Sequence, residues 1–290
     1  MISDSILQTL AYSDHFGFPL TLEEIHTRLV GARYSRLQIT TAINKMLKTE
    51  SICRSGDYYH LPGHSNLVAR RENNRQTSLP VFSKAKMLAI KLGHVPGVLA
   101  IFLTGSLAMS NSTLDSDIDF MVITKNNRLW TTRFLLTIFT TILGLRRTPH
   151  SKSHSAKLCL NLYLSPTSYL LPPDRRSLYT AYELIQAVPL YDPTDTHSQI
   201  LSANSWIHDY LPNAPKGSDL KGSAQSRHYD ERGRSDPIGA VLEFILYHLQ
   251  LLYMKRKITR EYITHDRAFF HPNNPSPKVR PAKEATKGSV

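Results

Sequence analysis

The chain has 290 residues, a formal net charge of +12 and two cysteines, Cys53 and Cys159. This length can bury a sizeable core in two or three units, and the composition is ordinary for a soluble globular protein. Two distant cysteines in apolar contexts suggest neither a disulfide framework nor a metal-spaced cysteine cluster. The positive charge favours a polyanionic partner, such as nucleic acid or nucleotide phosphates, and a merely solvated basic surface is the alternative.

Residues 1–62 are predicted to form a compact unit of three helices and a β-hairpin. The segments TLEE (21–24) and SRLQ (35–38) are capping-box patterns, which predict the N-termini of the second and third helices. Two short β-prone runs around Ser-Gly-Asp in SICRSGDYYHLPG, from residue 51, predict the hairpin. This order of elements is a winged-helix pattern.

The outer face of the third helix carries side chains that suit phosphates and base edges. They are Arg36, Gln38, Thr40, Thr41, Asn44, Lys45 and Lys48. DNA is therefore a candidate partner of this unit. A protein-docking module with a solvated charged face is the alternative.

Residues 66–212 are predicted to form an α+β unit with a mixed sheet. Two apolar strands, 98–105 and 118–124, flank a polar loop, and a third strand follows at 158–165. Helices are expected before residue 93, over about 128–145, and over LYTAYELIQAVPLYD, which begins at residue 178. Between the last two, His150 and His154 lie in a Ser/Lys-rich loop that we expect to be mobile rather than metal-binding.

The C-terminal part is predicted to contain a flexible linker (213–237), a helical segment (238–270) and a disordered basic tail (271–290). The apolar helix within the segment is expected to pack on the preceding unit, with dimerisation or membrane contact as alternatives. The apolar run 129–145 is short for a bilayer span. We expect no membrane span, and the absence of a signal-peptide pattern at the N-terminus favours a cytoplasmic location.

Four residues around the polar loop indicate the chemistry. Asp117 and Asp119 alternate with apolar residues, so strand periodicity places both carboxylates on one face. Two adjacent carboxylates repel, and a divalent cation such as Mg²⁺ removes that conflict. Gly105 allows close backbone approach and Ser106 can present hydroxyl and amide to a phosphate oxygen. A phosphate turn beside a metal pair is what nucleotidyl transfer needs.

The spacing of these residues resembles the signature of the DNA polymerase beta-type nucleotidyltransferase superfamily. That signature is a Gly-Ser pair followed by an Asp-x-Asp motif within an apolar strand. In this chain ten residues separate the two motifs. The resemblance implies that Gly105 and Ser106 hold the triphosphate of an NTP. It also implies that Asp117 and Asp119 bind two Mg²⁺ ions, with Mn²⁺ as a substitute. The fold that it implies is a polymerase beta-like palm.

A wider resemblance covers most of residues 1–272. The segments PLTLEEIHTRLV, YYHLPG, SDIDFMVIT, CLNLYLS and AFFHP are similar to those of an uncharacterised bacterial group with an N-terminal winged helix and a nucleotidyltransferase domain. This resemblance implies the same two-part organisation here.

The chain departs from the superfamily pattern at the third carboxylate. No acid occurs between Asp119 and Asp174, and the third strand offers Asn161 where an acid is expected. An amide can ligate a metal or orient a hydroxyl, but it cannot act as a general base. Three outcomes follow: catalysis with a reduced site, recruitment of a later acid such as Asp174 or Glu183, or nucleotide binding without turnover. Lys125 and Arg128, just past the second strand, are candidates for contact with the triphosphate.

The leading prediction is therefore a Mg²⁺-dependent transfer of an NMP group from an NTP to an acceptor hydroxyl. The acceptor is a protein, a nucleic acid or a small molecule. The alternative is a winged-helix DNA-binding regulator with a degenerate, nucleotide-sensing transferase domain.

Overall fold

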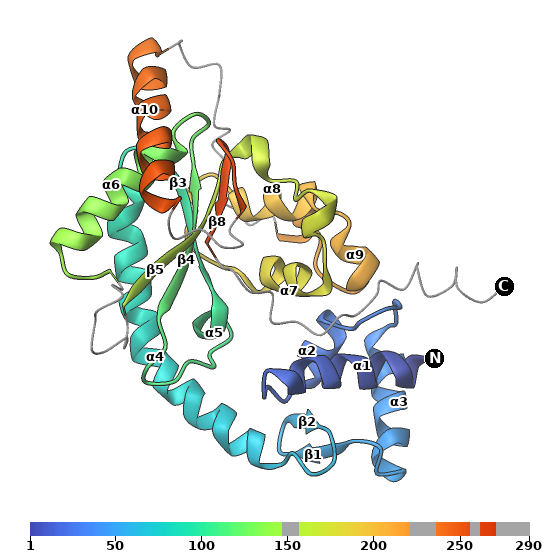
Figure 1. Ribbon diagram of the computed structural model, residues 1–290. Coiled ribbons are helices and arrows are strands. Elements are labelled where there is room, and N and C mark those ends of the chain that lie inside the picture. The colour runs from blue at the N-terminus through green and yellow to red at the C-terminus, as the bar shows by residue number, and fades with distance from the viewer. Residues whose placement is uncertain (147–156, 221–235, 256–261, 271–290) are drawn as a thin grey trace.

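The computed structural model describes all residues except 147–156, 221–235, 256–261 and 271–290 (Figure 1). Over the described residues the chain is an α+β structure with ten α-helices, a six-stranded mixed sheet and a two-stranded hairpin. The α+β prediction is confirmed. Most of the predicted linker, the predicted tail, and His150 and His154 lie outside the described residues.

The N-terminal helices and hairpin form as the capping patterns predict. Thr21 and Ser35 each accept a 3.3 Å hydrogen bond from the amide three residues on. A small core of buried apolar side chains joins the helices to the hairpin. The elements are α1 (Ile2–His15), α2 (Leu22–Thr27), α3 (Arg36–Lys48), β1 (Cys53–Ser55) and β2 (Tyr58–His60).

The main sheet has the strand order β6-β3-β4-β5-β8-β7. Strands β4 and β5 are parallel, and every other neighbouring pair is antiparallel. The strands are β3 (Val98–Thr104), β4 (Ile118–Thr124), β5 (Leu158–Leu164), β6 (Val188–Tyr191), β7 (Tyr262–Ile263) and β8 (Arg267–Phe269).

Helices cover both faces of this sheet (Figure 1). Ile101, Phe120 and Val122 face one layer, and Phe102 and Met121 face the other, as strand alternation requires. The first layer holds α4 (Asn66–Gly93), α6 (Leu129–Ile142) and α10 (Pro237–Met254). The second holds α7 (Leu178–Gln186), α8 (Thr196–Ala203) and α9 (Ile207–Tyr210).

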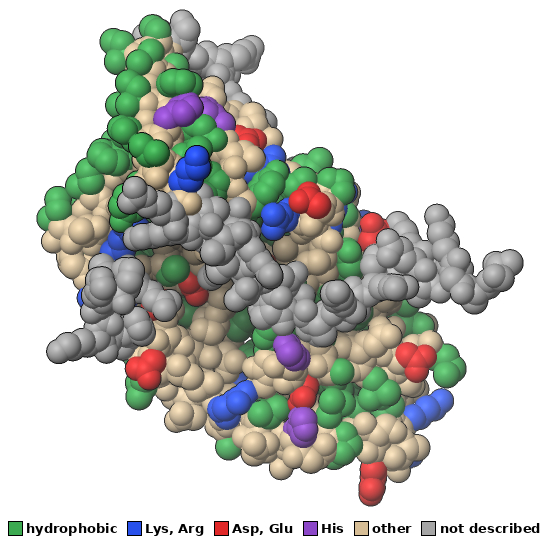
Figure 2. All heavy atoms as spheres, viewed as in Figure 1, with side chains coloured by type: hydrophobic (Ala, Val, Ile, Leu, Met, Phe, Trp, Pro, Cys, Tyr) green, Lys and Arg blue, Asp and Glu red, His purple; other side chains and the backbone are tan. Residues whose placement is uncertain are grey.

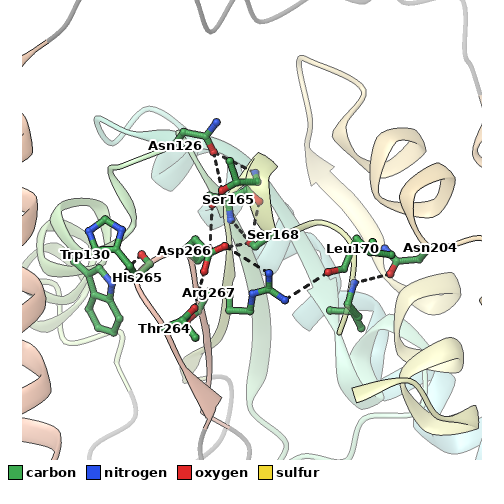
Figure 3. A network of polar contacts seen from close by, with 12 residues as sticks. Asn126, Trp130, Ser165, Ser168, Leu170, Asn204, Thr264, His265, Asp266 and Arg267 are labelled. Carbon is green, nitrogen blue, oxygen red and sulfur yellow. Dashed lines mark hydrogen bonds and ion pairs between the residues drawn. The ribbon is translucent and has the colours of Figure 1, made fainter. Parts of the chain in front are cut away.

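Two parts of the sheet differ from the prediction. The segment Val188–Tyr191, predicted as the end of a helix, is the edge strand β6, because Pro189 lacks the amide that a helix interior needs and an edge strand tolerates. The β7–β8 hairpin lies within the segment predicted to be helical. Its turn is fixed by the carbonyl of Asp266, which accepts hydrogen bonds from Ser165 and from Ser168, the latter at 2.8 Å (Figure 3).

Helix α10 packs on α6 through one narrow face. Glu243 and Leu246 are buried there, whereas much of the rest of the helix is exposed and apolar, as the side chains along it in Figure 2 show. Among the described helices, α10 is the one long and apolar enough by composition to cross a membrane. The prediction that it packs on the preceding unit is thus met by part of its surface.

Candidate functional site

The register of β3 and β4 brings the Gly-Ser turn to the paired aspartates. Thr104, the last residue of β3, pairs with Asp119 in β4. Gly105 follows at once and begins the four-residue helix α5 (Gly105–Ala108), with Ser106 exposed. Sequence positions that are fourteen residues apart therefore meet at one end of the sheet.

Gly105 lies against the carboxylate of Asp119. Its φ of +67° is in the left-handed region, and a Cβ added there would lie 2.6 Å from Oδ2 of Asp119. Any larger residue would be strained in its backbone and would also displace this carboxylate. The glycine is therefore required by the contact between the turn and the acid.

Asp117 and Asp119 share the face of the sheet that α7 covers. Asp117 immediately precedes β4, and Asp119 lies in line with Met121 on that face. The loop before them is held by α4: Ser78 accepts a 3.1 Å hydrogen bond from the Ser112 amide, and Asn74 donates one of 2.9 Å to Asn111. The acid pair is thus carried on a strand and a fixed loop.

Asn161 touches Asp119 directly. A register shift in the β4–β5 pair places Leu160 opposite Phe120 and Leu162 opposite Met121, so Asn161 is the extra residue of a bulge. Its Nδ2 donates a 2.9 Å hydrogen bond to Oδ1 of Asp119. Asn161 is thus a hydrogen-bond donor that orients the Asp119 carboxylate.

A later carboxylate, Glu183 of α7, also faces Asp119. Burial among protein atoms, together with the negative charge of Asp119, raises the pKa of Glu183 to about 7, against a smaller opposing effect of its hydrogen bond with Tyr179. Asp174 lies elsewhere, in a short 3-10 turn, where its exposed side chain is 3.4 Å from Arg175. Of the two later acids considered, the structure brings Glu183 to the pair.

Lys125 and Arg128 are not brought to the site. They follow the C-terminal end of β4, whereas the acid pair lies at its N-terminal end, roughly 20 Å away along seven residues of strand. The guanidinium of Arg128 instead pairs with Asp236, the N-cap residue of α10. The structure therefore does not bring these two cations to the acid pair, because they follow the opposite end of the strand.

A cavity of about 290 Å³ opens beside Gly105 and Ser106. One wall is α7, where the spacing of Tyr179, Tyr182, Glu183 and Gln186 puts all four on one helix face. The opposite wall comes from the N-terminal unit and includes Tyr12, Ser13, Phe16, Phe18 and Arg28. A second cavity, of about 430 Å³, shares Arg28 and Met109 with the first.

The N-terminal unit is fixed against α7 and the residues after it. The Tyr12 and Tyr182 rings stack with centroids 4.5 Å apart, and Tyr182 Oη donates a 3.0 Å hydrogen bond to the carbonyl of Arg28. The Gly31 amide donates to the Tyr210 carbonyl at 3.0 Å, and Asn213 donates to the Tyr34 carbonyl at 2.8 Å. The two walls of the cavity therefore form one packed structure.

The acid pair suits a magnesium ion that the substrate helps to bind. Mg²⁺ takes oxygen ligands and is commonly held by one or two carboxylates together with substrate phosphates and waters. Asp117 and Asp119 supply such a pair next to a turn that keeps its backbone open. Within the described part of the chain, no group of three or more His, Cys, Asp or Glu side chains forms a metal site by itself. The donor set thus fits a metal ion that takes its further oxygen ligands from outside the chain.

Comparison of the chain with protein-family models, with curated proteins and with solved structures finds no match in any of the three.

The sequence does not predict which residues form the walls of the cavity. Tyr12, Phe16 and Phe18 are an aromatic cluster around the end of the first helix, which is a signal of packing rather than of binding. No sequence pattern indicates that Tyr179 and Gln186 line a cavity. The cavity exists because α1 docks against α7 and supplies its opposite wall. Trp130 and Trp206 are both buried and belong to the two cores of the main sheet.

Proposed function

We propose that this protein is a Mg²⁺-dependent nucleotidyltransferase of the polymerase beta type, with an N-terminal winged helix. It binds an NTP through Gly105, Ser106, Asp117 and Asp119, and it transfers the NMP group to an acceptor hydroxyl. The observation that carries the proposal is the close approach of the Gly105 turn to the Asp119 carboxylate. A phosphate held at that turn would lie beside the acids that hold its metal.

The chemistry follows from this juxtaposition. The acceptor oxygen attacks the α-phosphorus and forms a new P–O bond, while the bond from the α-phosphorus to the bridging oxygen breaks and pyrophosphate leaves. The hydroxyl proton passes to a carboxylate or to solvent. Mg²⁺, when bound, neutralises charge on the phosphates. Asn161 keeps the Asp119 carboxylate in one orientation, which matters because this chemistry depends on positioning.

The missing third acid does not exclude transfer. Glu183 supplies a carboxylate close enough to Asp119 for their charges to interact, and it lines the cavity next to the Gly-Ser turn. This arrangement supports the hypothesis that a later acid completes the site. Its side chain comes from a helix over the sheet rather than from the neighbouring strand.

The test is transfer of label from α-³²P-NTPs with Mg²⁺ or Mn²⁺, using the full-length protein and cell extract as the source of acceptors. Asp117→Ala and Asp119→Ala should abolish transfer and metal-dependent NTP binding. The matched control is Asp4→Ala, which removes an exposed carboxylate on α1. Saturable metal-dependent binding of NTP with no transfer to any acceptor would refute the proposed enzymatic activity. The protein would then be a nucleotide sensor.

A second candidate function is a DNA-binding regulator that senses nucleotide through a degenerate transferase domain. Two observations favour it: Asn161 stands where the third acid is expected, and most of the polar and basic residues on the outer face of α3 are exposed. Binding to DNA should weaken steeply with salt and with a double Lys45→Ala, Lys48→Ala substitution. No retention on DNA at low salt would exclude this function.

A further inference from the structure

The cavity beside the Gly-Ser turn has the composition of a site for a planar ring. Its walls carry aromatic rings on both sides, Phe16 and Phe18 from the N-terminal unit and Tyr179 and Tyr182 from α7. The amide of Gln186 and the guanidinium of Arg28 add hydrogen-bonding groups of the kind that read ring edges. Aromatic faces with a few polar groups are the usual lining of a ligand pocket.

The size and position of the cavity restrict its occupant. A volume of about 290 Å³ is at the small end of the range for ligand pockets, so it suits one nucleoside rather than an oligonucleotide. Gly105 and Ser106 form part of its lining, so a group bound inside it would be continuous with phosphates held at the turn.

We propose that this cavity holds the nucleoside moiety of the NTP, with the base between the aromatic residues of the N-terminal unit and those of α7. The N-terminal unit is then part of the substrate site and not only a separate DNA-binding module. This inference rests on the proposed NTP binding at Gly105 and Asp119. It adds the residues that recognise the base.

The packing of the walls explains how such a site would be maintained. Tyr12 and Tyr182 are almost completely buried and stack on each other, so they form a rigid floor. Phe16 is 38% exposed at the rim, where its ring centroid lies 5.4 Å from that of Tyr12. A base that entered the cavity would cover this exposed ring, and burial of aromatic surface against a base favours binding.

The experiment compares two ligands, each with Mg²⁺, on the full-length protein by calorimetry. One is the NTP that binds best of the four, and the other is inorganic tripolyphosphate, which has no nucleoside. Phe16→Ala and Gln186→Ala should weaken NTP binding, roughly tenfold for the loss of one stacking ring, and leave tripolyphosphate binding unchanged. Phe244→Ala, which removes an exposed ring on α10, is the matched control and should change neither.

The outcomes separate this inference from the proposed function. Equal affinity of the wild type for NTP and tripolyphosphate, or NTP affinity unchanged in both cavity variants, would overturn the nucleoside site while leaving metal and phosphate binding intact. Absence of metal-dependent binding of either ligand would instead refute the proposed function, and the nucleoside site with it.

A labelling experiment on the unmutated protein covers the case in which a variant fails to fold. An azido-purine triphosphate, irradiated with the protein and Mg²⁺, should label peptides within residues 12–18 or 179–186, and excess NTP should protect them. Label confined to other peptides would overturn the proposal.

Discussion

The side-chain amide of Asn161 donates a 2.9 Å hydrogen bond to Oδ1 of Asp119, across the parallel pair of β4 and β5. Through this contact the asparagine satisfies one lone pair of Asp119 without adding negative charge. The site therefore avoids the repulsion that a third strand-borne carboxylate would create when no metal is bound.

The substitution Asn161→Asp tests the effect of adding a negative charge beside Asp119. Without metal it should destabilise the protein by about 1–3 kcal/mol, because the hydrogen bond to a charged group is lost and a like charge is added. With saturating Mg²⁺ the loss should shrink, since a further carboxylate strengthens metal binding. Melting temperature against Mg²⁺ concentration measures both effects. Asn44→Asp, on the exposed face of α3, is the control and should show no Mg²⁺-dependent shift.

The raised pKa of Glu183 makes the stability of the metal-free protein depend on pH. Its pKa is about 7 when folded and about 4.5 when unfolded, so the native state binds the proton more tightly. The free energy of unfolding should fall as pH rises from about 4.5 to 7. The pKa shift sets an upper limit of about 3 kcal/mol, and the fall should be smaller because solvent in the cavity screens the side chain. Urea unfolding at pH 5 and pH 8 checks this.

In Glu183→Gln the contribution of this group to the pH dependence should disappear. The exposed Glu50→Gln serves as the control. An unchanged pH dependence in Glu183→Gln would contradict the role assigned to burial and to Asp119.

The glycine of the Gly-Ser turn offers a matched pair of substitutions. Gly105 and Gly56 have φ values of +67° and +60°, but an added Cβ meets Asp119 at the first and nothing within 4 Å at the second. Gly56→Ala should cost about 1–2 kcal/mol, the ordinary penalty of the left-handed region. Gly105→Ala should cost more and should also weaken metal-dependent NTP binding. Equal losses of unfolding free energy, with unchanged NTP affinity, would show that the close approach is unimportant.

Glu243 of α10 stabilises the start of α6. Its carboxylate accepts hydrogen bonds from the amides of Trp130 and Thr131, at 2.7 and 2.8 Å. Glu243→Leu should cost about 3 kcal/mol, because two buried amides lose a charged acceptor. Glu243→Gln should cost less, since it keeps one acceptor oxygen. Leu249→Ala, on the exposed side of the same helix, should be close to neutral. Hydrogen exchange at the first turn of α6 would localise the effect.

The sequence was sufficient for the local parts of the fold. Strands at 118–124 and 158–164, the capped helices α2 and α3, and the hairpin all follow from periodicity and capping, which act over a few residues. The pairing of β3 with β4 also follows, because only a polar loop separates them. The meeting of Gly105 with Asp119 was therefore accessible from the sequence.

The remainder depends on contacts between distant segments. The hairpin β7–β8 pairs with β5 across roughly a hundred residues, and no local pattern indicates that partner. Lys125 and Arg128 are close to Asp119 in sequence, but they follow the far end of β4. Proximity in sequence therefore does not bring them to the acid pair. The cavity required α1 to dock on α7, which neither segment indicates by itself.

The stack of Tyr12 on Tyr182 places the outer face of α3 and the wall of the cavity in one packed body. A ligand on α3 that shifted the helices packed against it would change the affinity of the cavity, and a ligand in the cavity would then change the affinity of α3 by the same factor. The contacts that join the N-terminal unit to α7 and the residues after it, of which this stack is one, would therefore set the coupling between any two ligands bound at these places.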